Sequence, residues 1–454
     1  MKRSSSFIYY TVNESFWFVP AVMALVAVGA ALGSVAIDRM LGGNWMDGMA
    51  LAWSGGAEGA RSVLSVIAGS TITVVSIVFS ITITALAQTS SQYGPRVLRN
   101  FTRDRGNQFV LGTFVAAFLF SLLVLRTVRA DGGEPFVPYL SVNLGIALAV
   151  LSIAVLIFFI HHIATSIQAD LLIARVGEEC REAVANVFPQ ELGAGAAWPA
   201  AELPAKPDAP GDLVAAKSVG YVQAVDDDAL FDSARRAQVL LTVLARPGDF
   251  VSTGRPLARV APVGALHDRL ADAIRDGFDI GDRRTPEQDL AYSVQQLVEI
   301  AARALSPGIN EPFTALLCID YLNAALRSLA GRDAPPPFRK DDSGAVRVVA
   351  YPLQFPEVVQ LSLGMIRRYA GGAADIYLGL LRALHDLASA LRREADREAL
   401  LDEVRQVHRD ALTVRNAQDR ERVLEKARET RDVLRAATLA GPPGRSGTAA
   451  DGRA

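Results

Sequence analysis

Four long apolar stretches dominate the first 165 residues and decide what this chain can fold into. They cover about residues 16–37, 63–87, 108–125 and 139–161. Each falls in or near the range of roughly 17–25 residues that an α-helix needs to cross a bilayer. The first is too long for the apolar core of a typical signal peptide, and no clean Ala-x-Ala cleavage site follows it. The sequence therefore predicts a membrane protein with a four-helix transmembrane region over residues 1–165.

The second of these stretches has a regular line of small polar residues. Its members follow one another at steps of three and four, which keeps them on one face of a helix. They rise by about 33 Å in total, close to the thickness of the hydrocarbon core. We refer to this line as the polar stripe: Ser62, Ser65, Gly69, Thr73, Ser76, Ser80 and Thr84. The opposite side is mostly aliphatic, although Thr71 and Thr82 also fall there.

Two interpretations of the polar stripe remain open at this stage. Small residues let helix backbones approach closely, and hydroxyls can hydrogen-bond across helices or to their own carbonyls, so the stripe suits helix packing. Hydroxyls can also replace part of the water shell of an ion, so the stripe suits the lining of a pore. Because it contains no charged residue, it indicates neither a proton relay nor tight cation coordination.

The loop charges predict the orientation of the spans. Basic residues gather in the amino-terminal lead and in the loop between spans two and three, where they are Arg96, Arg99, Arg103 and Arg105. Cytoplasmic loops are rich in Lys and Arg, so we expect both termini in the cytoplasm and the chain in the plasma (inner) membrane of a bacterium. The same arginines suit contacts with lipid phosphates, or a ring around a pore mouth that would favour anions.

The remainder of the chain has the composition of a soluble protein. We expect an amphipathic helix and a Pro/Ala-rich linker over residues 166–212, a small β-rich module over 213–264, a mainly helical domain over 265–437 and a disordered tail over 438–454. Together these predict a cytoplasmic α+β domain. The net charge of −2 gives no case for nucleic acid. Two isolated cysteines give neither a disulfide framework nor a metal spacing.

The β-rich module contains a hairpin that resembles barrel-sandwich modules, the fold of biotinyl and lipoyl carriers. The match covers Gly248, Asp249, Val251, Gly254 and Leu257. A carrier needs a modifiable lysine at a hairpin tip, whereas the nearest lysine here, Lys217, lies outside this hairpin. We therefore expect a structural module and no cofactor.

Two helices are predicted after this module. Thr285, Pro286 and Gln288 have the pattern of a capped helix start, and that helix is expected to run to Leu305. The segment that follows, with Ser306, Gly308 and Asn310, ends it and offers a cap to a second helix from Glu311 to Leu329. The free N–H groups of a helix start can bind an anion. A shaped turn between packed helices is the alternative, and Glu311 argues against a phosphate there. A single long helix is expected over 395–437.

Several motifs of this chain agree, in order, with one family. RRTPEQDLAYSVQQLVEIAARALSPGINEPFTALLCID follows SVGYVQAVD and RPGDFVSTGRPLARV, and the second span contributes TITVVSIVFSITITALAQTSSQYGPRVL. Over roughly residues 10–430 the chain resembles a family of predicted bacterial membrane proteins that is catalogued only as a domain of unknown function. The resemblance implies four amino-terminal spans followed by a cytoplasmic domain, and it implies no activity.

Motifs of the common enzyme classes are not found in the sequence. There is no Walker-type loop, no G-x-G-x-x-G after a strand, no H-E-x-x-H and no G-x-S-x-G. We therefore expect neither an enzyme nor a metal site. Two hypotheses remain: a homo-oligomeric ion channel or transport protein whose second span lines the path, or a membrane-anchored sensor or scaffold whose cytoplasmic domain binds a ligand or partner protein. The expected partners are the lipid bilayer, further copies of the chain, and an ion or small anionic ligand.

Overall fold

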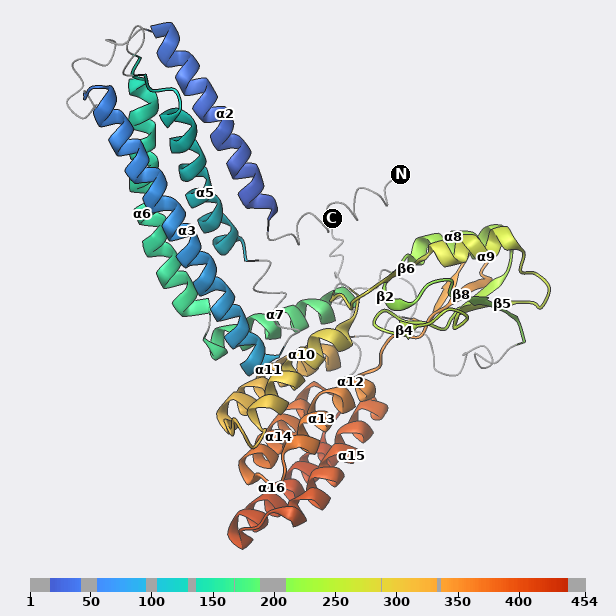
Figure 1. The fold of residues 1–454 in the computed structure, drawn as a ribbon. Coiled ribbons are helices and arrows are strands. Elements are labelled where there is room, and N and C mark those ends of the chain that lie inside the picture. Colours follow the sequence, from blue (N-terminus) through green and yellow to red (C-terminus); the bar gives the residue numbers. More distant parts are fainter. Residues whose placement is uncertain are drawn as a thin grey trace, which may run out of the picture. The chain divides into compact units, whose positions relative to one another are not determined.

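The protein is described by a computed structural model over residues 17–41, 55–94, 104–129, 136–166, 168–187, 210–286, 288–332 and 336–439. The chain divides into two compact units, Met1–Leu171 and Leu172–Ala454 (Figure 1). Each unit is described by itself. The amino-terminal lead, most of the Pro/Ala-rich linker and most of the expected tail lie outside the described residues.

In the described residues, the first unit is a bundle of four long helices that run alternately up and down (Figure 1). They are α2 (Phe18–Leu41), α3 (Ala57–Tyr93), α5 (Arg105–Leu125) and α6 (Tyr139–Ser166). All four begin within a few residues of the expected spans, but α3 is longer at both ends. Its 37 residues correspond to about 55 Å, more than the roughly 30 Å of a hydrocarbon core.

Helix α5 is the centre of this bundle. It packs against α2, α3 and α6. Of the residues in its most apolar 18-residue segment, 61% are buried, against 22–28% in the corresponding segments of the other three helices. Gly112 permits the close approach of α2, because an added Cβ would lie 2.5 Å from Met23 Sδ. Phe114 and Phe120 of α5 fill the two apolar cores of the bundle. The other helices therefore each turn one face outward.

Five helices of the described chain are long and apolar enough to cross a membrane. Four are the helices of the first unit, and the fifth is α11 (Pro312–Ala330) in the second unit. The mean hydropathy of the fifth is 1.2, whereas the first four reach 2.2–2.7. Length and composition alone therefore give one more possible span than the four expected.

The second unit contains two small β-sheets. The five-stranded sheet has the order β1 (Asp212–Ala215), β5 (Pro256–Ala261), β3 (Leu240–Val243), β8 (Val346–Val349), β7 (Phe338–Lys340). The three-stranded sheet has the order β4 (Phe250–Val251), β2 (Gly220–Val225), β6 (Phe278–Gly281). All pairs are antiparallel except β3 with β8. Helices α8 (Asp227–Ala237) and α9 (Asp268–Asp276) share one apolar core with the strands.

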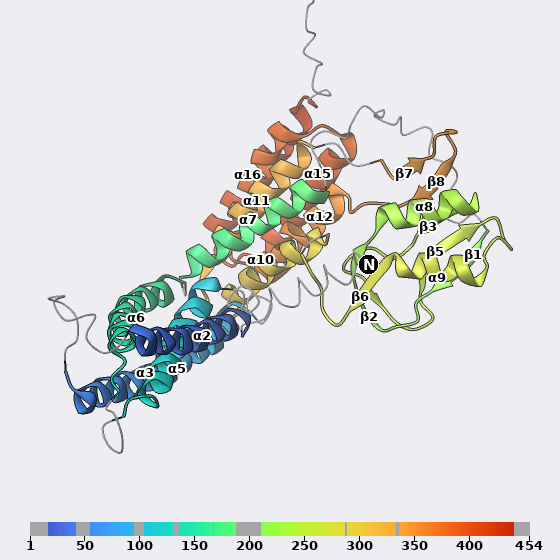
Figure 2. The same ribbon diagram turned by 90° about the horizontal axis from the view of Figure 1, so that it is seen from above.

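The β-rich module continues beyond the boundary expected at residue 264. Strand β6 pairs with β2. The β7–β8 hairpin joins the larger sheet because β8 pairs with β3, although the hairpin begins more than 80 residues after β3 ends. Figure 2 shows this hairpin beside α8 and β3. A pairing between distant strands leaves no local pattern in the sequence, so composition placed the boundary too early.

The rest of the second unit is helical. Its helices are α7 (Ala169–Val187), α10 (Leu290–Ala304), α11 (Pro312–Ala330), α12 (Phe355–Leu361), α13 (Leu363–Tyr369), α14 (Ala374–Leu387), α15 (Glu394–Asp410) and α16 (Ala417–Ala436), with short 3₁₀ turns at Ala388–Ala390 and Ala411–Thr413. Helix α7 packs closely on α11, because a Cβ added at Gly177 would lie 2.4 Å from Tyr321 Cδ1. The coarse expectation of a membrane region followed by an α+β region is confirmed.

The expected carboxy-terminal helix over 395–437 is wrong. The chain turns at the 3₁₀ segment Ala411–Thr413, and α15 and α16 pack against each other as a helical hairpin. Asn416 starts α16 by accepting hydrogen bonds from the N–H groups of Gln418 and Asp419. That capping asparagine was the local signal for the break.

Candidate functional site

The polar stripe lies on the outer face of the helical bundle. Ser62, Ser65, Gly69, Thr73, Ser76, Ser80 and Thr84 are all exposed in the single chain. The buried residues of the same helix include Leu64, Ile67, Thr71, Val78 and Thr82. At about 100° per residue, the centres of the two sets lie roughly 180° apart around the helix. Within the described residues of the first unit, the stripe therefore takes no part in helix packing.

The hydroxyls of the stripe are partly satisfied by their own helix. Thr73 Oγ1 donates to the carbonyl of Gly69 at 2.9 Å, and Ser76 Oγ donates to Ile72 at 3.1 Å. Thr84 Oγ1 donates to Ser80 in the same way at 2.9 Å. These bonds use the hydroxyl protons and leave oxygen lone pairs directed outward. The face can thus meet an apolar helix, or present oxygen atoms to a bound cation.

The two threonines on the opposite side of α3 play a structural part. Thr71 Oγ1 donates to Ile67 at 2.7 Å, and Thr82 Oγ1 donates to Val78 at 2.8 Å. Because both are buried against the other helices, back-bonding to the preceding turn removes the cost of an unpaired hydroxyl. This accounts for the polar residues that interrupt the aliphatic side of the helix.

The basic loop falls mostly outside the described residues. Arg96, Arg99 and Arg103 are among the residues not described, and Arg105 is exposed at the first position of α5. The residue before it, Asp104, caps α5 by accepting a hydrogen bond from Gly106 N at 2.8 Å. The interpretations of this loop as a topology signal and as a pore-mouth ring remain predictions.

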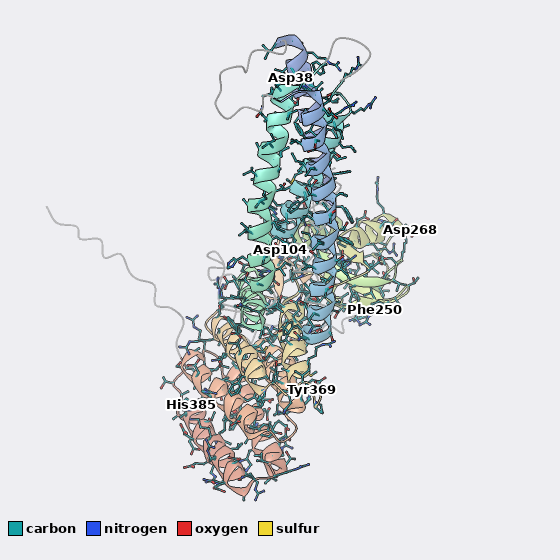
Figure 3. The ribbon with its side chains drawn as sticks, turned by 60° about the vertical axis from the view of Figure 1, so that its left-hand side comes forward. Asp38, Asp104, Phe250, Asp268, Tyr369 and His385 are labelled. Carbon is teal, nitrogen blue, oxygen red and sulfur yellow. The ribbon has the colours of Figure 1, made fainter. Side chains whose placement is uncertain are left out.

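A polar cluster that was not predicted from the sequence lies at the end of the bundle where α5 begins. His162 Nε2 of α6 is 2.7 Å from Asp104 Oδ2, with side-chain exposures of 22% and 11%. Asn107, 2% exposed, has no hydrogen-bond partner for its amide among the described residues. Figure 3 shows Asp104 at the opposite end of the bundle from Asp38. A buried asparagine in the first turn of α5, directly before the predicted span, was the signal available for this cluster.

The turn with Ser306, Gly308 and Asn310 is a compact link between α10 and α11. Ser306 Oγ donates to the carbonyl of Arg303 at 2.6 Å, and Asn310 adopts a left-handed conformation with φ of 55°. Asn310 therefore does not cap α11; that position belongs to Glu311. The carboxylate of Glu311 suits the positive end of the helix dipole. These contacts favour the shaped turn over an anion site.

The segment before α10 connects the β-rich module to the helices. Asp289, and not Thr285, caps α10, so the expected start of that helix is wrong by four residues. Gln288 instead bonds to the backbone of Val225 in β2, at 2.9 Å to its N–H and 3.3 Å to its carbonyl. Thr285 Oγ1 bonds to the carbonyl of Gln223. Tertiary pairing with β2 therefore replaces the local capping pattern.

Asp289 is the central group of this connection. It is 3% exposed and accepts hydrogen bonds from Arg284 Nε at 2.7 Å and Nη2 at 2.8 Å, a bidentate ion pair. Tyr292 N also donates to it at 3.0 Å. The hairpin of the β-rich module touches it at Gly248, where an added Cβ would lie 2.3 Å from Asp289 Oδ2. Thr285 and Gln288 of the predicted helix start, and the capping Asp289, therefore all make structural contacts.

Lys217 is not placed like the modified lysine of a carrier. It lies in the bend between β1 and β2 and forms a 2.8 Å ion pair with Asp272 of α9. Among the described residues no group of three or more His, Cys, Asp or Glu could hold a metal ion. Cys180 and Cys318 are both buried and free.

A bundle of apolar helices joined to an α+β unit defines the class of an integral membrane protein. The profile of the family described as predicted membrane protein (DUF2254) matches residues 13–386. The chain belongs to this family, as its motifs indicated. It is also 34% identical to uncharacterized proteins of Mycobacterium tuberculosis and Mycobacterium bovis, in an alignment 449 residues long that covers 95% of this chain and 84% of theirs. No solved structure matches the chain.

Proposed function

We propose that the protein is a homo-oligomeric membrane protein of the inner membrane, in which the polar stripe of α3 lines a path for ions. The observation that carries this proposal is the position of the stripe, on the face of α3 opposite its own bundle. A face of small and polar residues along the membrane depth suits close contact between copies better than contact with lipid tails. A set of copies around an axis would remove that line from lipid and bring several such lines together.

The proposal assigns four spans to the membrane and keeps α11 in the second unit. Helix α11 packs against α10 and α14, and it buries Cys318, Ile319 and Leu322 in that contact. It also contains Asp320 and Arg327, which are unfavourable in a lipid-facing span. With four spans and the basic second loop inside, both termini lie in the cytoplasm. The proposed function is not enzymatic.

The outward hydroxyl oxygens suggest the kind of ion. Thr73, Ser76 and Thr84 give their protons to carbonyls of α3, so each presents an oxygen acceptor to whatever lies outside. Oxygen acceptors replace water around a cation better than around an anion. We therefore favour a monovalent cation, because no carboxylate of the stripe is available to hold a divalent one.

Flux from liposomes tests the proposal. The purified full chain is reconstituted, and cation efflux is compared for wild type, Thr73→Leu and Ser76→Leu. Leucine is favourable in a span, so these variants should insert normally and lower the flux several-fold. Ala154→Leu on the exposed face of α6 is the matched control and should leave the flux unchanged. Equal flux from all four proteins would refute the lining role.

The second candidate function is that of a membrane-anchored sensor or scaffold. In that case the stripe is a packing face between copies, and the second unit binds a ligand. One observation favours this alternative: an arginine-lined groove in the second unit, described below. An oligomer that conducts no ions, under varied salt and pH, would support the sensor over the channel.

A further inference from the structure

A groove with room for about 310 Å³ lies between α15 and α16. Both helices run side by side in Figures 1 and 2. The lining residues are Val404, Arg405, His408 and Arg409 of α15, and Ala427, Arg428 and Arg431 of α16. Four of these seven residues are arginines and none is a carboxylate. The groove lies beyond residue 386, where the match to the family profile ends.

The carboxylates near the groove hold its arginines only weakly. Arg405 pairs with Asp402, Arg428 pairs with Glu421 at 3.0 Å, and Arg431 pairs with Asp432 at 2.9 Å. Those three acids are 59–65% exposed and do not line the groove. Exposed pairs of this kind contribute about 0–1 kcal/mol, so an incoming anion can displace them.

Arg409 differs from the other three. It is exposed, and its guanidinium makes no hydrogen bond or ion pair with another side chain in the described part of the chain. His408 beside it adds a ring that can donate a hydrogen bond. The groove thus has at least one full positive charge without an acidic partner, and three more that are loosely paired.

The shape of the groove also suits a small ligand. Its lining contains Val404 and Ala427, each 2% exposed, and the side chains of four arginines from two different helices. Guanidinium groups bind phosphate oxygens in pairs, with a geometry that lysine does not offer. The volume is at the lower end of the range of about 300–1,000 Å³ for small-molecule sites.

The lining of the groove is more basic than the rest of α16. Elsewhere on α16 opposite charges alternate, as in the pairs Arg422 with Asp419 and Lys426 with Glu429. Along the lining of the groove, basic side chains of two helices come together and no acidic side chain is present. We infer that this groove binds a small ligand with several phosphate charges, either a soluble polyphosphate compound or the headgroup of an anionic phospholipid.

Binding can be measured on the purified full chain in detergent, by calorimetric titration with inorganic tripolyphosphate. We expect one ligand per chain, and an affinity that falls about tenfold or more in Arg409→Gln and in Arg428→Gln, since each loses a charged hydrogen bond. Arg422→Gln is the matched control: it removes the same charge from α16 outside the groove, and it should alter the affinity less than about twofold. Thermal unfolding should show all variants folded.

A second measurement separates the two sources of phosphate. Mass spectrometry of the purified chain reports whether phosphatidylglycerol is retained, and whether Arg409→Gln with Arg428→Gln loses it. Tripolyphosphate binding that depends on these arginines supports a soluble ligand, and arginine-dependent lipid retention supports a headgroup. If neither probe binds, or if both bind equally well to the double variant, the inference is wrong. Neither readout depends on ion flux, so both measurements test the groove independently of the proposed channel.

Discussion

Ser141 Oγ, in the first turn of α6, donates a 2.7 Å hydrogen bond to Asp38 Oδ2, in the last turn of α2. Asp38 also accepts from the N–H groups of Leu140 at 2.9 Å and Ser141 at 3.0 Å, and it is only 4% exposed. Asp38 therefore caps the start of α6 from another helix and places a negative charge at the positive end of its dipole. Ser34 Oγ, 2.8 Å from Ser141 Oγ, extends this cluster.

We predict that Asp38→Ala destabilises the bundle by about 1–3 kcal/mol, because it leaves two buried N–H groups without an acceptor. Thermal unfolding of the full chain in detergent measures this. Met40→Ala, two positions away and 85% exposed, is the control and should change little. The double variant Asp38→Ala with Ser141→Ala should be non-additive by about 0.5–3 kcal/mol. Full additivity would contradict the direct bond.

The two glycines of the β-rich hairpin offer a matched pair. Gly248 and Gly254 have φ angles of 94° and 90°, so alanine is strained at either by about 1–3 kcal/mol. An added Cβ has nothing within 4 Å at Gly254, but at Gly248 it would meet Asp289. Gly248→Ala should therefore cost at least about 1 kcal/mol more than Gly254→Ala, because it also disturbs the Arg284–Asp289 ion pair. Equal losses in unfolding experiments would mean that the contact contributes nothing.

Because the carboxyl of Glu403 is buried, we predict that the stability of the protein depends on pH. Its side chain is fully buried, Arg367 Nε donates to Oε1 at 2.6 Å, and Oε2 has no partner in the described chain. Burial raises the pKa of Glu403 above its usual value of 4.5, although Arg367 opposes this. A group with a raised pKa stabilises the fold fully below its unfolded pKa, and this contribution is lost as the pH rises through the folded pKa.

Wild type should therefore lose stability relative to Glu403→Gln as the pH rises from about 4.5 towards neutrality. Glu429→Gln is the opposite control. Lys426 lowers the pKa of the exposed Glu429, so its contribution is present above 4.5 and is lost as the pH falls. Unfolding midpoints over a pH series measure both slopes. A difference between wild type and Glu403→Gln that stays constant with pH would overturn the assignment.

The apolar spans were predictable because each bears its own signal. A run of some 20 apolar residues has few alternatives to a helix that is buried in lipid or protein. The polar stripe was also visible, since the period of a helix fixes which residues share a face. Whether that face points into or out of the bundle could not be predicted. The sequence of α3 alone does not indicate that Leu64 and Thr71 contact the rest of the bundle while Thr73 is exposed.

Features that depend on contacts between residues far apart in the chain could not be predicted from the sequence. Gln288 has the local pattern of a capping residue, but its side chain pairs with β2 some 60 residues earlier. Strand β8 pairs in parallel with β3, about 100 residues earlier, and no local pattern indicates this partner. The capping role of Asp38 depends on the approach of α6, more than 100 residues later in the chain. The arginine groove likewise required the break before α16, which turns a row of charges into two facing walls.

The polar stripe gives a last prediction, on which surface joins the copies. Chemical labelling can address it cleanly, because both native cysteines are buried and burial raises the pKa of the Cys180 thiol to about 12, so little thiolate forms at neutral pH. A cysteine introduced at Ser76 lies in the middle of the stripe, and a short bifunctional thiol reagent in native membranes should link it to a second copy. Ala154→Cys, exposed on α6, should yield no dimer, because that face is expected to meet lipid. Dimers from Ala154→Cys alone would move the interface to α6 and remove the stripe from any shared path, whereas dimers from Ser76→Cys alone are what a face shared between copies of α3 requires.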